Sequence, residues 1–272
     1  MNWFEKFIYA LQFKVEEPPL FGWFHLTAVA IIAVIVAIVI IFRKKISRKA
    51  VNNTMLTVGI ILLISEIFKQ CIHAMDVVDG VAEWNYSWRV FPFQFCSVPM
   101  YLYIIAGIIR KGKVYNTILC FLATFALFGG LAVSIYPSTV LSATLYNSIH
   151  TMVWHGSLLI IAVMLLVTGA VALSFKSVFK AGIVFVIILV IAQAMNFTWH
   201  FLGDPDRTFS MLYISPYYQC DIPVLHDIKE KAPYIVFLIS YIAGFIAVAC
   251  IVMGTAIGIN KLHHLVSNKK SA

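Results

Sequence analysis

The chain has 272 residues, of which 61% are hydrophobic and only 12% are charged, and its mean hydropathy is +0.91. A soluble domain carries about one quarter charged residues, so an ordinary water-soluble protein is excluded and lipid is the expected solvent. The formal net charge of +8 comes largely from loops that flank apolar runs, and it gives no reason to expect nucleic acid as a partner.

The N-terminal segment 1–20 is predicted to form an interfacial amphipathic helix. Trp3, Phe7 and Leu11 recur at helical spacing, and polar residues occupy the opposite face. Pro18-Pro19 would end this helix. An ordinary frayed tail is the alternative interpretation of the same residues.

Seven apolar runs follow, each close to the about 20 residues that a helix needs to cross a bilayer. They lie at approximately 21–42, 54–75, 91–110, 114–136, 147–174, 180–203 and 233–259. We therefore predict an all-α fold, a polytopic membrane helix bundle of about seven transmembrane helices over residues 21–260. Residues 261–272 are expected to form a basic cytoplasmic tail, and residues 203–232 a long external loop that caps a site.

Charge is distributed unequally between the two sides of this predicted bundle. One side holds no acidic residue, and its basic residues are Arg43, Lys44, Lys45, Arg48, Lys49, Arg110, Lys111, Lys113, Lys176, Lys180, Lys261, Lys269 and Lys270. The other side holds every acid except Glu66, namely Glu5, Glu16, Glu17, Asp76, Asp79, Glu83, Asp204, Asp206, Asp221, Asp227 and Glu230. The positive-inside rule therefore places the N-terminus outside and the C-terminus in the cytoplasm.

Polar side chains within the apolar runs concentrate in the half nearer the outside, where they are costly unless paired or facing a cavity. They are His25, Glu66, Lys69, Gln70, His73, Gln94, Asn147, His150, His155, Gln193, Asn196 and His200. Two sets, 66–73 and 193–200, recur at helical spacing and share one face each. We predict a polar, substrate-binding pocket among the first, second, third, fifth and sixth spans. The alternative for Glu66 and Lys69 is an internal ion pair that joins two helices.

The third run contains the most unusual stretch, from Phe91 to Pro99. Pro99 cannot donate to the carbonyl of Phe95 and clashes with it, so the helix must kink or start late near Cys96. Such a break exposes a reactive side chain at membrane depth, although a buried thiol beside a proline kink is the plainer interpretation. The five cysteines show no metal-binding spacing, and Cys71 with Cys220 is the pair that we considered for a disulfide.

These residues carry a resemblance that covers nearly the whole chain. The chain resembles the YwaF-type bacterial integral membrane proteins, which are related to the eukaryotic transmembrane protein 164 acyltransferases. The matching features are His25, the Pro-x-x-x-Cys-Ser segment 92–97, the pair His155-Gly156, and Asn196. Bacterial relatives typically carry a histidine where this chain has Gln94, which puts proton transfer at that position in doubt.

The resemblance implies a lipid acyltransferase that uses a cysteine nucleophile. The eukaryotic relatives move fatty acyl chains between phospholipids through a cysteine, so Cys96 is implied as the nucleophile, with His150 or His155 as its base. The candidate oxyanion donors are Gln70, Asn147 and Asn196. A membrane phospholipid or lysophospholipid is the implied partner, the bacterial cell membrane the implied location, and neither metal nor cofactor is expected.

Two other classes of function stay open. Six of the polar residues, including Glu66 and His73, are of types that bind metal, which would suit a metal-dependent membrane hydrolase. No HExxH or HxxxH spacing occurs to support it. A non-catalytic receptor or transporter with an external pocket is the third class, although the chain has no internal repeat and no polar path to its inner face.

Overall fold

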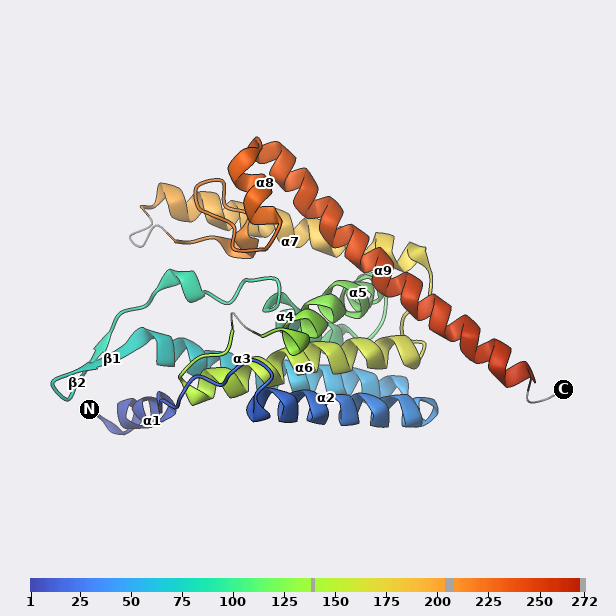
Figure 1. Cartoon of the computed structure of the whole chain (residues 1–272), viewed down its shortest axis with the longest axis horizontal. Helices are drawn as coiled ribbons and strands as arrows, with labels where there is room; N and C mark the ends of the chain where they lie inside the picture. Colours follow the sequence, from blue (N-terminus) through green and yellow to red (C-terminus); the bar gives the residue numbers. More distant parts are fainter. Residues whose placement is uncertain (138–139, 204–207, 270–272) are drawn as a thin grey trace.

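The computed structural model describes residues 1–137, 140–203 and 208–269, so Asp204, Asp206 and Lys270 lie outside the described residues. It is a helical bundle with one two-stranded sheet (Figure 1). In chain order the elements are α1 (Trp3–Leu11), α2 (Trp23–Phe42), η1 (Arg43–Lys45), α3 (Arg48–Ala74), β1 (Met75–Val78), β2 (Val81–Trp84), η2 (Trp88–Val90), α4 (Val98–Ile109), α5 (Lys113–Ile135), α6 (Leu145–Val167), α7 (Phe175–Phe201), η3 (Met211–Tyr213), α8 (Leu225–Lys231) and α9 (Tyr234–Lys269).

The helices confirm the predicted all-α membrane bundle. Among the described residues, 6 helices are long and apolar enough to cross a membrane, namely α2, α3, α5, α6, α7 and α9. The third predicted span differs from the others, because α4 has only 12 residues. Its length is about 18 Å, against a hydrocarbon core of about 30 Å. The chain makes the rest of this pass without regular helix.

The late start predicted from Pro99 is confirmed. Helix α4 begins at Val98 with Pro99 in its first turn, where a missing N–H breaks no intrahelical hydrogen bond. The preceding residues, 91–97, are irregular. Proline chemistry therefore divides this pass into a non-helical half and a helical half.

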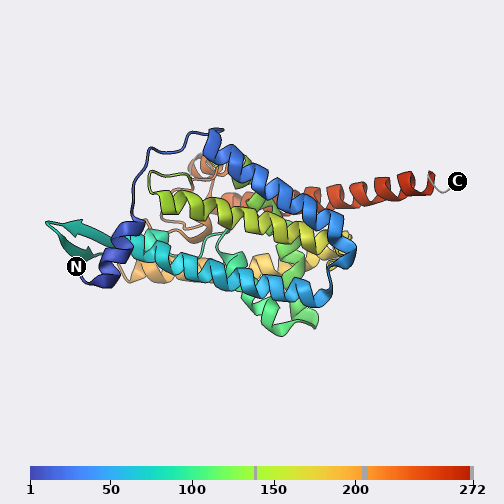
Figure 2. The ribbon, with the colours of Figure 1, turned by 90° about the horizontal axis from the view of Figure 1, so that it is seen from below.

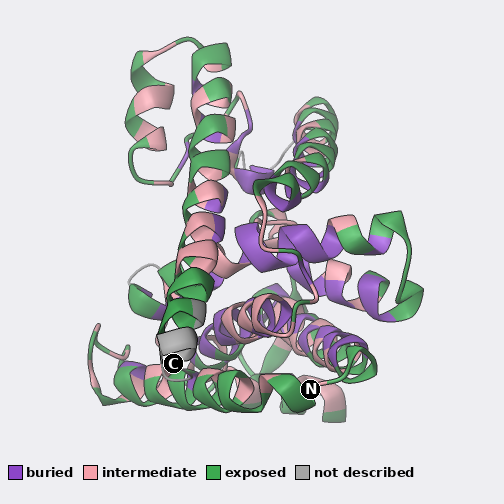
Figure 3. Cartoon of the chain, turned by 90° about the vertical axis from the view of Figure 1, so that its right-hand side faces the viewer, coloured by how far each residue is buried: buried purple, intermediate pink, exposed green. Residues whose placement is uncertain are grey.

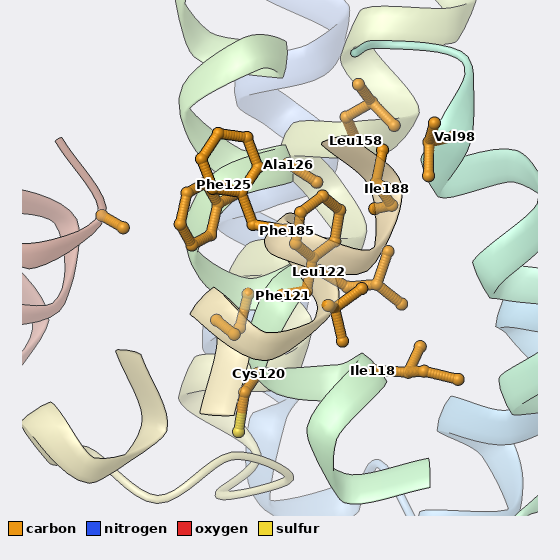
Figure 4. Packing of buried hydrophobic residues seen from close by; sticks show 14 of the residues in the cluster. Val98, Ile118, Cys120, Phe121, Leu122, Phe125, Ala126, Leu158, Phe185 and Ile188 are labelled. Carbon is orange, nitrogen blue, oxygen red and sulfur yellow. The ribbon is translucent and has the colours of Figure 1, made fainter. Parts of the chain in front are cut away.

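Helix α5 lies at the centre of the bundle and packs against α4, α6, α7 and α9. Its residues Phe121 and Phe125 stack with ring centroids 5.3 Å apart, and Phe125 stacks on Phe185 of α7 at 4.8 Å (Figure 4). A Cβ on Gly130 would lie 2.7 Å from the carbonyl oxygen of His155, so this glycine allows α5 and α6 to approach closely. Buried residues therefore concentrate on central segments, while the outer helices expose their apolar outward faces (Figure 3).

The N-terminal helix α1 docks on the end of α3. Asn2 and Glu5 form a capping box, and Ile8 is fully buried in a small cluster with Ile72 and Met75. Trp3, on its other side, is 79% exposed. The predicted amphipathic helix is therefore present, and its place at the membrane interface stays a prediction.

A β-hairpin that the sequence analysis did not predict follows α3. Strands β1 and β2 pair antiparallel from Met75 opposite Trp84 to Val78 opposite Val81. Asp79 and Gly80 connect them with positive φ angles of 50° and 78°, the backbone of a tight hairpin turn. The hairpin projects from the same end of the bundle as the N-terminus (Figure 1).

The basic connections gather at the opposite end of the bundle. The links from α2 to α3, from α4 to α5 and from α6 to α7 lie there, and α9 extends beyond the bundle on that side (Figure 2). Helix α9 has 36 residues, so it is about 54 Å long, and the predicted tail is helical to Lys269. Which end faces the cytoplasm stays a prediction. Cys71 and Cys220 are free thiols, so the disulfide that we considered is absent.

Candidate functional site

Three helices each supply a side chain that donates a hydrogen bond to a backbone carbonyl in, or directly before, the irregular segment 91–97. Gln70 Nε2 donates to the Val90 carbonyl at 2.8 Å, and the Tyr101 hydroxyl donates to the Pro92 carbonyl at 3.1 Å. Trp154 Nε1 donates to the Cys96 carbonyl at 2.7 Å. Irregular backbone is tolerated at membrane depth only where protein or a watery cavity satisfies it, so these donors make the non-helical half of the pass possible.

Trp154 connects the Cys96 backbone to His150. The Trp154 indole lies 4.9 Å from the His150 imidazole, centroid to centroid, and both side chains are buried. The hydrogen bonds of the described residues include none between an imidazole and the Cys96 thiol.

We expect Trp154→Phe to loosen the irregular segment. The substitution keeps an aromatic ring in the core but leaves the buried Cys96 carbonyl without its donor, which costs about 1–3 kcal/mol of stability. Thermal unfolding in detergent should show a lower Tm, and amide exchange should rise in residues 91–97. Trp23, which is 79% exposed, supplies the matched control. Trp23→Phe should leave both readouts unchanged, and equal behaviour of the two variants would contradict this role.

Glu66 is the centre of a buried polar cluster between α3 and α6. Lys69 Nζ lies 2.8 and 3.0 Å from its two carboxylate oxygens, and His150 Nε2 lies 3.4 Å from Oε2. Gln70 Nε2 donates to Oε1 at 2.5 Å. The predicted shared face of 66–73 is confirmed by these contacts. Glu66 and Lys69 do form the internal ion pair of the alternative interpretation, but both lie on α3. The contact that reaches a second helix is that of Glu66 with His150 on α6.

Tyr86 extends this cluster toward the hairpin end. Its hydroxyl donates to Gln70 Oε1, and burial raises the pKa of Tyr86 to about 12, so the phenol stays a neutral donor. Nearby, Asn147 Nδ2 lies 3.4 Å from His73 Nε2. Asn147 Oδ1 is buried and has no hydrogen-bond partner among the described residues. A polar ligand group would satisfy such an atom.

Gln94 and Asn196 hold the loop that follows α7. Gln94 donates to the Ser210 carbonyl at 3.0 Å and accepts from the Leu212 amide at 2.9 Å. Asn196 donates to the Met211 carbonyl at 3.1 Å and accepts from the Met211 amide at 2.7 Å. These four bonds fix a buried turn in which Leu212 has a positive φ of 56°, a strained backbone for a leucine. The predicted external loop is thus partly folded into the bundle.

We expect Asn196→Leu to release this turn. Two buried backbone groups of Met211 lose their partners, so the protein should lose about 2 kcal/mol of stability or more. Hydrogen exchange of residues 208–215 should rise in the variant. Asn53→Leu, on an exposed part of α3, is the control and should leave that exchange unchanged. Protection that persists in the Asn196 variant would contradict the assignment.

The other polar residues of α7 face the same loop. Gln193 accepts from the Tyr234 hydroxyl at 3.1 Å. The imidazole of His200 stacks on Tyr217, with centroids 3.5 Å apart and an angle of 7°. The predicted shared face of 193–200 is therefore the face that carries the loop and the start of α9.

The hydrogen-bond partners of His25 and His155 lie outside both groups. His25 accepts from the Phe21 amide at 3.1 Å through Nδ1 and contacts the Ser134 carbonyl at 2.9 Å through Nε2, so α2 is tied to α5. His155 Nδ1 contacts the Thr151 carbonyl of its own helix at 2.8 Å. The polar residues thus form separate groups of contacts, and both ring nitrogens of His25 contact backbone groups. A substrate-binding role for His25 stays a prediction.

A polar cavity of about 490 Å³ lies between the start of the irregular segment and the loop after α7. Its lining includes Arg89, Gln94, Ser210, Tyr213, Tyr217 and Asp221. Gln94 is the one predicted site residue that the lining contains. Gln94 also precedes Cys96 by two residues, so the cavity lies next to the chain segment that carries the thiol. Arg89 and Ser210 were not predicted as site residues, because no sequence pattern shows that two loops meet. The length of the loop after α7 was the signal that pointed to a site there.

A second, apolar groove of about 410 Å³ opens beside α7. Its lining includes Trp88, Phe91, Ile191, Ala194, Trp199 and Phe209. The rings of Trp88 and Trp199 lie 4.1 Å apart, centroid to centroid, and Trp199 lies 5.3 Å from Phe209. None of these residues was predicted to belong to a functional site, because an apolar groove in a membrane protein has the same composition as a lipid-facing surface.

The histidines do not gather into a metal site in the described part of the chain. No group of three or more His, Cys, Asp or Glu side chains there is placed to hold a metal ion. His25 is engaged with Ser134, His150 faces Glu66, and His200 stacks on Tyr217. The described residues therefore provide no cluster of metal ligands that would support a metal-dependent hydrolase.

Comparison with known proteins identifies the family. A family model described as the TMEM164 family matches residues 20–226. The chain belongs to the TMEM164 family. No curated protein and no solved structure matches it. Every candidate site residue, from His25 to His200, falls within the part that the TMEM164 family model covers, whereas α1 and α9 lie outside that part. The resemblance noted from sequence is thereby confirmed, and the chain is a multi-pass membrane protein of this family.

Proposed function

We propose that this protein is a membrane-embedded lipid acyltransferase in which Cys96 is the nucleophile. The observation that carries the proposal is the position of Cys96 on a non-helical stretch. Its carbonyl accepts from Trp154, whose ring lies beside His150 of the Glu66 cluster, and Gln94, two residues before Cys96, lines the polar cavity. Membership in the TMEM164 family supports the same chemistry, which the resemblance implies.

His150 is the proposed base, because its buried ring lies beside Glu66 and next to Trp154, which holds the Cys96 carbonyl. His150 Nε2 lies 3.4 Å from Glu66 Oε2 and has no hydrogen-bond partner among the described residues, so it is available for proton transfer. Lys69, which pairs with Glu66 in the same cluster, is the proposed source of the positive charge that stabilises the thiolate. Contact between thiol and imidazole requires a rearrangement when substrate binds, as is common for catalytic pairs without ligand.

The proposed reaction proceeds in two steps that share one proton carrier. His150 takes the thiol proton, and the Cys96 sulfur attacks the ester carbonyl of a donor phospholipid. The ester C–O bond breaks, and the proton passes to the departing lysophospholipid oxygen. The hydroxyl of an acceptor lysophospholipid then gives its proton to His150 and attacks the thioester. The C–S bond breaks, and the proton returns to the Cys96 sulfur.

Covalent labelling tests this proposal. The purified protein is reconstituted in phosphatidylcholine vesicles that contain phosphatidylcholine with an alkyne-tagged acyl chain. We expect a hydroxylamine-sensitive tag on Cys96, in excess over Cys71 and Cys120. Equal tagging of the three thiols, or a tag that persists in a Cys96→Ser variant, would overturn the proposal. A bacterial plasma membrane as the site of action stays a prediction.

A second candidate function is a non-catalytic receptor that binds a polar ligand in the cavity. The observation that favours it is the lining itself, which includes Arg89 and Asp221 but not Cys96. Such a receptor would retain full function after Cys96→Ser and lose it after Arg89→Ala. The acyltransferase, by contrast, is expected to lose turnover after Cys96→Ser, so the thiol variant separates the two functions.

A further inference from the structure

The polar cavity and the apolar groove adjoin along two chain segments. Arg89 lines the cavity and its neighbour Trp88 lines the groove, while Thr208 lines the cavity and its neighbour Phe209 lines the groove. A molecule with a charged end and a hydrocarbon end can therefore occupy both at once. The two volumes, about 490 and about 410 Å³, are each in the range of small-molecule sites.

The groove opens on an exposed, apolar side of α7. Ile191 is 45% exposed, and Ile187, one turn earlier on the same face, is 53% exposed. From Ile191 to Trp199 the groove follows α7 for about 12 Å, close to the about 15 Å of one leaflet's hydrocarbon. This length and the apolar lining favour an acyl chain from the bilayer as the occupant.

We propose that this groove binds one acyl chain of a membrane phospholipid whose phosphate lies in the polar cavity near Arg89. The lipid enters sideways past α7 without leaving the membrane, and its ester region lies at the junction of the two spaces. This assignment rests on the proposed function for the identity of the ligand. Trp88, Trp199 and Phe209 supply the apolar wall, and the Arg89 guanidinium supplies the charge complement to phosphate.

Photocrosslinking locates the chain directly and does not depend on turnover. The protein is reconstituted in phosphatidylcholine vesicles that contain phosphatidylcholine with a diazirine on one acyl chain, then irradiated and mapped by peptide mass spectrometry. We expect crosslinks at residues 88–91 and 191–199. Ala194→Trp fills the groove and should reduce them at least about tenfold, and Ala194→Met should reduce them less.

Ile187→Trp is the matched control, since it places the same indole on the same face of α7 outside the groove. It should leave the crosslinks at 88–91 unchanged. Ala194 is exposed, so the added side chain meets open space, and an unchanged Tm would confirm that the fold is intact. Equal crosslinking of wild type and Ala194→Trp, with both folded, would overturn the groove assignment.

The Cys96→Ser variant separates this inference from the proposed function. It should retain the crosslinks, because binding of the chain does not use the thiol. If Cys96→Ser also retained acyl transfer, the catalytic proposal would fail, while the assignment of the groove to an acyl chain would still hold. If Ala194→Trp left the crosslinks unchanged while Cys96→Ser ended transfer, the groove would fail and the catalytic proposal would stand.

Discussion

Cys96→Ser should reduce acyl transfer between phosphatidylcholine and lysophosphatidylcholine by at least about a thousandfold, because loss of a covalent nucleophile removes the intermediate and both of its steps. Transfer is measured in reconstituted vesicles by the appearance of labelled chain on the lysophosphatidylcholine. The variant should fold normally, since serine fits the space of cysteine and Trp154 still donates to the same backbone carbonyl.

Cys71→Ser is the control for this prediction. Cys71 is a free, half-buried thiol at the hairpin end of α3, and it packs beside α1 away from the cavity lining. The Cys71→Ser variant should retain the wild-type rate of acyl transfer. A Cys96→Ser protein that transfers acyl chains at that rate would exclude a thioester mechanism for the family member described here, whatever the lipid it acts on.

Glu66→Ala should lower the free energy of unfolding by about 3–5 kcal/mol, because a buried charge that loses its partner is left uncompensated. Lys69 would keep its ammonium group in the bundle with no carboxylate, and Gln70 and His150 would lose a contact each. Unfolding in detergent, followed by loss of helical signal, measures the change.

The double substitution Glu66→Leu with Lys69→Met provides the decisive comparison. Replacing both charges with apolar side chains of similar size removes the uncompensated charge, so much of the lost stability should return. Glu83→Ala, on the exposed hairpin, should change the free energy of unfolding by no more than about 0.5 kcal/mol. A double variant as unstable as Glu66→Ala would contradict the view that the loss of stability comes mainly from the uncompensated charge of Lys69.

Features set by local rules were predictable from sequence. The contact of Glu66 with Lys69 and Gln70 follows from helical periodicity, which depends only on neighbours in the chain. The late start of α4 follows from the missing N–H of Pro99. The hairpin was missed although Asp79-Gly80 between apolar residues is a usable hairpin signal.

Features set by distant backbone groups were not predictable. His25 meets the carbonyl of Ser134, 109 residues away, and Asn196 meets both backbone groups of Met211. Every residue carries the same backbone atoms, so a sequence gives no sign of which carbonyl a side chain will meet. The same reasoning explains why polar residues expected in one chamber divide into the Glu66 cluster, the loop contacts and His25.

Gln94 joins the irregular segment to the loop after α7. It precedes Cys96 by two residues, and its amide holds both Ser210 and Leu212 across the bundle. Because Gln94 also lines the cavity, a ligand bound there would contact the residue that connects this turn to the backbone beside the thiol. We therefore expect occupancy of the cavity to shift the backbone at Cys96.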